Sequence, residues 1–149
     1  MQDNNKFQFE KLDVWSSARE LVQRIYKMIN KDFPRVETFG LSNQIARACV
    51  SVSSNIAEGS ASNYPRDNGM MLNSAIKSLN EVVSQLFNAL DLQYIDQQQF
   101  DELYQFCDVL NRRLFALRNY HSQNSKKSYK TSYNANMEQI RLLQNEEDN

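Results

Sequence analysis

Glycine and proline are scarce in this chain, and their scarcity limits the folds that it can adopt. The 149 residues include three Gly and two Pro. These are too few for the many tight turns of a β-sandwich or β-barrel. The length is sufficient for one domain with a sizeable core. The sequence therefore predicts an all-α protein.

Four segments carry apolar residues at intervals of three and four, which is typical of helices that bury one face. They span about residues 13–30, 42–60, 67–92 and 96–120, with Asp13 and Asp96 as expected N-caps and Gly59 as an expected stop signal. The expected core positions are Trp15, Ala18, Val22, Ile25, Ile29, Ile45, Ala48, Val52, Ile56, Leu72, Ala75, Leu79, Val82, Leu86, Ala89, Phe100, Leu103, Cys107, Leu110, Leu114 and Leu117. Leu21, Tyr26 and Met28 widen the first stripe.

The connections between these segments are mostly short, which places successive helices antiparallel. The predicted architecture is an antiparallel up-down-up-down four-helix bundle over residues 12–121. Residues 1–11 are expected to be irregular. Residues 122–149 are polar and low in aliphatic side chains, so we expect a mostly disordered tail with a short helix near 137–143 as its one ordered element.

The sequence has no apolar run long enough for a membrane span and no signal peptide at its polar start. We therefore expect a cytoplasmic protein without a membrane partner. Cys49 and Cys107 both fall on apolar helical faces. Two buried thiols are favoured over a disulfide or a metal site.

Charge is distributed unevenly among the predicted helices. Arg47 is the sole charged residue in 41–57, and Lys77 and Glu81 are the sole ones in 68–90. A helix that faces solvent on one side normally carries charge there, whereas an interface core is depleted in charge. The pattern predicts self-association, with a solvated Ser/Asn-rich face on a monomer as the alternative. Substituting Ala75 or Ser78 by Arg would test this interface.

The run "NIAEG" at 55–59 places an Asn and a Glu in a helix of small and apolar residues. Buried polar groups cost free energy unless they are paired, but they can fix register. Glu58 lies near the helix C-terminus, where negative charge is unfavourable. We expect a cationic partner for it among Arg47, Arg66 and Lys77.

Three stretches together resemble a known family: "LDVWSSARELVQRIY", "ETFGLSNQIARACVSVSSNIAEGSA" and "LNSAIKSLNEVVSQLFNALDLQYI". In order and spacing they are similar to the 23S rRNA-intervening sequence protein family over about residues 9–120. The resemblance implies a bacterial four-helix bundle that forms a homo-oligomer, with pentamers among the relatives. It also implies that the following are structural family residues: Trp15, Gly40, Leu41, Gln44, Asn55, Glu58 and Gly59.

One branch of this family serves as the accessory protein of reverse transcriptases in diversity-generating retroelements, where a basic surface binds nucleic acid and the polymerase. The resemblance thus implies RNA or DNA, and a protein such as a reverse transcriptase, as partners. The chain departs from the family at Ala46-Arg47, where two Arg are common, and at Ser53, where Pro is common. The first change removes a positive charge, and the second should straighten the helix.

Three functions are open. An enzyme is disfavoured because the one His, His121, has no partners at metal-ligand spacing and no phosphate-binding loop is present, so no cofactor is expected. A nucleic-acid-binding oligomer would use Arg47, Arg66, Arg112, Arg113, Arg118 and the tail lysines Lys126, Lys127 and Lys130. Alternatively, Arg112, Arg113 and Arg118 only complement a helix C-terminus. A protein-interaction scaffold, with Tyr129 and Tyr133 docking on a partner, is the third.

Overall fold

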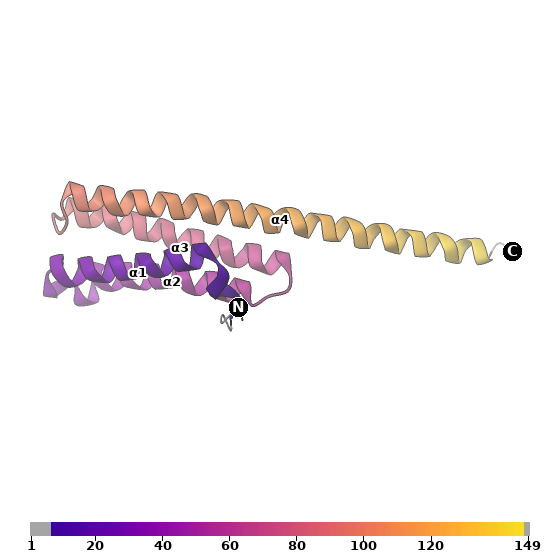
Figure 1. Ribbon diagram of the computed structural model, residues 1–149, viewed down its shortest axis with the longest axis horizontal. Helices are drawn as coiled ribbons and strands as arrows, with labels where there is room; N and C mark the ends of the chain where they lie inside the picture. The colour runs from indigo at the N-terminus through magenta and orange to yellow at the C-terminus, as the bar shows by residue number, and fades with distance from the viewer. Residues whose placement is uncertain (1–6, 148–149) are drawn as a thin grey trace, which may run out of the picture.

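The computed structural model describes residues 7–147, with side chains through residue 138. This range contains the elements η1 (Gln8–Lys11), α1 (Asp13–Asp32), η2 (Arg35–Phe39), α2 (Leu41–Ser60), α3 (Pro65–Asp91) and α4 (Gln97–Glu147), and no strand. In Figure 1 the helices α1, α2, α3 and α4 lie side by side, and α4 continues past the ends of the others. The predicted all-α class is confirmed.

The core lies along the facing sides of all four helices. The largest fully buried side chains are Leu21, Ile25, Ile45, Val52, Ile56, Leu79, Val82, Leu86, Cys107, Leu110 and Leu114. In α1 the buried face is rotated from the expected stripe, since Leu21 and Met28 are buried whereas Val22 and Ile29 are half-buried. The buried thiols of Cys49 and Cys107 agree with the expectation for both cysteines.

Asp96 caps α4 as expected. Its carboxylate accepts a hydrogen bond from the Gln99 backbone N–H at 2.8 Å, and the Gln99 side chain accepts one from the Asp96 N–H at 3.0 Å. This reciprocal pair satisfies two backbone donors at the helix start. Asp13 differs from expectation, because Leu12 is the N-cap of α1 and makes no side-chain capping bond.

The end of α4 corrects the expectation of a mostly disordered tail from residue 122. The helix continues through residue 147. After Gly69 the sequence contains no Gly or Pro, so nothing in it interrupts the backbone ladder. The bundle supplies the costly helix nucleus, and later turns need only propagate from it. The side chains of residues 126–138 are all exposed.

α2 ends at Ser60, close to the expected boundary, but Gly59 does not form a left-handed cap there, since no described Gly has a positive φ. Gly59 is instead buried at the crossing of α2 and α3. A Cβ at Gly59 would lie 2.8 Å from Met71 Cβ. The missing side chain allows the two helices to approach closely.

Asn55 joins the same pair of helices through a serine relay. Its Nδ2 donates to the Ser51 carbonyl oxygen at 2.8 Å and to Ser51 Oγ at 3.0 Å. Ser51 Oγ lies 2.9 Å from Ser78 Oγ on α3. The Asn of the NIAEG run is therefore paired within α2, and the hydroxyl contact between Ser51 and Ser78 links α2 to α3.

Gly40 and Glu37 organise the start of α2. The Glu37 carboxylate accepts hydrogen bonds from the Leu41 N–H at 2.7 Å and from the Tyr94 hydroxyl at 2.9 Å. A Cβ at Gly40 would come within 2.3 Å of Glu37 Oε2. Gly40 thus leaves room for the carboxylate that caps α2 and ties it to the α3–α4 connection. The bond to Glu37 raises the pKa of Tyr94.

Within residues 7–147, the helices include none with a stretch both long and apolar enough to cross a membrane.

Candidate functional site

The middle of α4 carries charge of one sign. Residues 109–137 include six Lys or Arg and no Asp or Glu, so this stretch has a formal charge of +6 within a chain of net charge −1. The acidic residues of α4 lie before it, at Asp101, Glu102 and Asp108, and after it from Glu138. Segregation of this kind produces a local positive field although the net charge of the chain is negative.

A groove lies where α3 begins and α4 leaves the bundle. Its volume is about 510 Å³. The lining residues are Pro65, Arg66, Gly69, Met70, Asn73, Arg118, Asn119, Ser122, Ser125 and Lys126. They include three cations, several amide and hydroxyl groups, and no carboxylate. We call this the cationic groove.

Arg118 is held in the cationic groove by neutral groups. Its Nη1 donates to Asn73 Oδ1 at 3.1 Å, and its Nη2 donates to Asn119 Oδ1 at 3.1 Å. The guanidinium carbon lies 4.4 Å from the centroid of the Phe115 ring. None of these contacts neutralises the charge, so Arg118 is oriented and remains available to an anion.

Asp67 is the acidic residue nearest in sequence to Arg66. It accepts a hydrogen bond from the Ser62 hydroxyl at 3.0 Å, in the connection between α2 and α3. It is not among the residues that line the cationic groove. The positive charges of Arg66 and Lys126 have no ion-pair partner within the described part of the chain.

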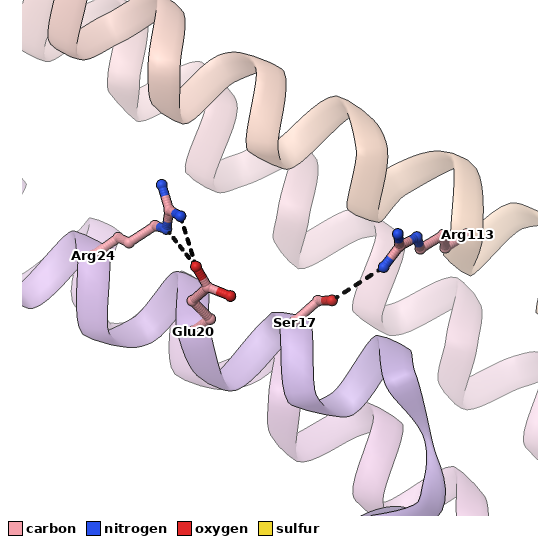
Figure 2. A network of polar contacts seen from close by, with 4 residues as sticks. All are labelled: Ser17, Glu20, Arg24 and Arg113. Carbon is pink, nitrogen blue, oxygen red and sulfur yellow. Dashed lines mark hydrogen bonds and ion pairs between the residues drawn. The ribbon is translucent and has the colours of Figure 1, made fainter.

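The structure separates the other predicted contacts from this groove. Arg112 is ion-paired with Asp108 one turn earlier on α4. Figure 2 shows Arg113 reaching from α4 toward α1, where its Nη1 lies 3.5 Å from Ser17 Oγ. Arg47 is exposed on α2. Of the five predicted arginines, the structure brings together Arg66 and Arg118.

The helix-dipole explanation for Arg112, Arg113 and Arg118 is wrong. It required a helix C-terminus near Tyr120, whereas α4 continues to residue 147. The partial negative charge of a helix is confined to its last turn. These arginines lie in the middle of a helix, and their charge needs another explanation.

Glu58 does not have the expected cationic partner. It is exposed near the end of α2 and makes no ion pair with any residue between 7 and 138. Trp15 lies against Phe9, with ring centroids 4.7 Å apart, and joins η1 to α1. Leu41 is half-buried against the core, and Gln44 is exposed. None of these four residues lines the cationic groove.

A second groove, between α1 and α4, has mixed charge. Its lining includes Arg24, Lys27 and Lys31, but also Asp32 and Glu102. Arg24 donates to the Glu20 carboxylate at 2.6 Å, a contact visible in Figure 2. Opposite charges in this groove compensate one another, which distinguishes it from the cationic groove.

His121 lines a third, smaller groove of about 260 Å³ with residues that include Asn63, Asn68 and Ser60. Burial lowers the pKa of its imidazole. The lining contains no carboxylate and no cysteine that could act with it. Burial also raises the pKa of Cys49 to about 11 and that of Cys107 to about 12, so both thiols stay protonated at neutral pH.

Sequence reasoning assigned Lys126 to a tail and missed its position beside Arg66 and Arg118. A signal was present. The absence of Gly and Pro after residue 69 favours an uninterrupted helix, and the spacing of eight residues places Lys126 near the face of Arg118. The proximity of Arg66, in contrast, follows from tertiary packing and has no local signal.

Two of three comparisons with known proteins give a match. The profile of a family described as 23S rRNA-intervening sequence protein matches residues 10–116. The chain is also similar to the crystal structure of a protein of unknown function from the S23 ribosomal protein family of Bacteroides thetaiotaomicron. The TM-score is 0.66 at 24% identity, over 71% of this chain and 95% of that one, a likeness of fold. A comparison with functionally curated proteins gives no match.

Proposed function

This chain belongs to the 23S rRNA-intervening sequence protein family, and from that premise we propose that it is a non-enzymatic, homo-oligomeric bundle that binds structured RNA through the cationic groove. The observation that carries the proposal is the convergence of Arg66, Arg118 and Lys126 on one groove without a carboxylate. Phosphate contacts from Arg and Lys dominate nucleic-acid affinity. Surface lysines and arginines that are paired with carboxylates would contribute less to the affinity for nucleic acid.

Self-association extends this proposal. The outward sides of α2 and α3 present exposed Val50, Ser54, Asn80, Ser84 and Phe87, and the charged residues of 41–57 and 68–90, which are also exposed, number three: Arg47, Lys77 and Glu81. Surfaces depleted in charge and containing aromatic residues are typical of interface cores. A ring of subunits, with a pentamer favoured by the family resemblance, would repeat the cationic groove once per subunit. Repetition raises the overall affinity for one RNA without new contacts.

We also propose that the helices form an antiparallel up-down-up-down bundle and that the protein is cytoplasmic. Short connections at residues 61–64 and 92–96 favour antiparallel neighbours. A non-enzymatic role is supported by the lack of converging acid, base and nucleophile around His121. A protein partner such as a reverse transcriptase fits an accessory role, but a scaffold without nucleic acid is the alternative.

The experiment is fluorescence anisotropy with a labelled structured RNA and a labelled DNA duplex, titrated with the full chain at several salt concentrations. Light scattering on the same samples gives the subunit number. We expect micromolar or tighter binding that weakens steeply with salt. An intact oligomer that binds neither probe at low salt would refute the nucleic-acid role and leave the scaffold.

A further inference from the structure

We infer that the α4 extension, defined as residues 122–138 of α4, binds unpaired bases of the nucleic acid whose phosphates occupy the cationic groove. The inference rests on the proposed function and names the part of the RNA that is recognised. A structured RNA with a single-stranded loop or overhang is the class of ligand. The family profile ends at residue 116, before this extension begins.

The helical register aligns polar, basic and aromatic side chains along one face of α4. Arg118, Ser122, Lys126, Tyr129 and Tyr133 follow one another at intervals of four, four, three and four residues. At 3.6 residues per turn, such intervals keep side chains on one face. The face that leaves the cationic groove therefore continues along the extension, over about 22 Å from residue 118 to residue 133 at 1.5 Å per residue.

The two tyrosines of the α4 extension are exposed to solvent. Tyr129 is 76% exposed and Tyr133 is 55% exposed, although both lie on a regular helix. No described aromatic ring stacks on either of them. Large rings are costly to leave in water, and on a helix without tertiary contacts they contribute nothing to folding. Their faces are available to a ligand.

Positive charge lies beside both rings. Lys126 and Lys130, both exposed, each precede a tyrosine by three residues, a spacing that makes side chains neighbours on a helix surface. The nearest acid along α4 in the C-terminal direction is Glu138. A basic surface that tracks the backbone, combined with aromatic rings on which bases stack, is the arrangement of single-strand-binding proteins. The bases of a duplex are already stacked on each other and cannot use such rings.

Charge complementarity selects the ligand over other occupants. A second copy of the extension would bring like charges from the lysines together, which opposes pairing of the basic segments side by side. An acidic protein could form ion pairs with the lysines, but this would not explain the two tyrosine rings spaced one turn apart. Nucleic acid uses both, since phosphates meet the lysines and bases stack on the rings.

The test compares two labelled RNAs with the full chain: a blunt hairpin, and the same hairpin with an unpaired twelve-nucleotide overhang. We expect the overhang RNA to bind at least about tenfold more tightly. The double variant Tyr129→Ala/Tyr133→Ala should lose that difference and keep the affinity for the blunt hairpin. The control Tyr129→Phe/Tyr133→Phe retains both rings and should retain the preference. Circular dichroism verifies that each variant stays helical.

The possible results distinguish failure of the inference about unpaired bases from failure of the proposed RNA binding. Equal affinity for both RNAs in the wild type, or an overhang preference that survives the alanine variant, overturns the inference and leaves the proposed function in place. Absence of binding to either RNA at low salt overturns both. A fall in oligomer mass in the alanine variant, with RNA affinities unchanged, would identify a second copy as the occupant and also overturn the inference.

Discussion

Gly59 illustrates how one absent side chain sets the distance between two helices. An added Cβ would lie 2.8 Å from Met71 Cβ, an atom that cannot rotate away from the backbone. Gly59→Ala should lower the free energy of unfolding by about 1–3 kcal/mol through overpacking, less the helix-propensity gain of about 1 kcal/mol. Chemical denaturation measures the change.

Gly69 gives the matched control, because it also lies within a helix and a Cβ there would meet nothing within 4 Å. Gly69→Ala should raise the free energy of unfolding by about 0.5–1 kcal/mol. Equal stabilisation by Gly59→Ala and Gly69→Ala would contradict the close approach of α2 and α3.

Tyr94 gives the chain a pH dependence on the alkaline side. Its hydroxyl donates to Glu37, which raises the pKa of the folded-state phenol above the ordinary value of about 10. Above that pH the unfolded chain loses this proton first, so stability falls as pH rises toward the folded pKa. Tyr94→Phe should make the decline above about pH 10 shallower in a denaturation series. An unchanged slope would show that the bond does not persist in solution.

At the scale of the element, the predicted and the observed structure differ most at the end of α4. The apolar stripe ends near Leu117, and sequence reasoning took the end of the stripe for the end of the helix. The stripe reports only where a helix is buried. A helix continues beyond its buried part when it is already nucleated and when no Gly or Pro interrupts it. α4 meets both conditions.

The helical extension is tested by a proline at an exposed position. Ser132→Pro removes a backbone donor and should disrupt the extension around that residue, at a cost of about 3 kcal/mol locally. We expect lower ellipticity at 222 nm and an unchanged thermal midpoint for the bundle, since the side chains of residues 127–138 are exposed. Ser132→Ala is the control and should keep full ellipticity. Identical spectra for the two variants would count against a helix there.

Other elements could be predicted because their signals are local. The capping pair of Asp96 and Gln99 and most core positions follow from residue type and period. The relay from Asn55 through Ser51 to Ser78 and the meeting of Arg66 with Arg118 depend on helices far apart in sequence. Ala75 is in the core with no exposed surface, and half-buried Ser78 bonds to Ser51, so neither is a suitable probe of an outer interface.

At the scale of the whole molecule, the outward side of α2 offers a better probe of self-association than Ala75 or Ser78. Ser54 is exposed there, and Ser54→Arg should place charge in the proposed interface and lower the mass measured by light scattering. Ser16→Arg adds the same charge at an exposed position on α1 and should leave the mass unchanged. A wild-type monomer, or a Ser54→Arg oligomer of full mass, would argue against α2 as the contact.

The central claim is that the cationic groove binds phosphates, and the salt dependence of RNA affinity tests it most directly. Arg66→Gln/Arg118→Gln should weaken binding and reduce the slope of log affinity against log salt by about 1.4 for single strands or 1.8 for duplex. Lys27→Gln/Lys31→Gln removes the same charge from the mixed groove near the start of α4 and should leave the slope unchanged. A wild-type slope in the arginine variant, or the same loss in both variants, would contradict the claim.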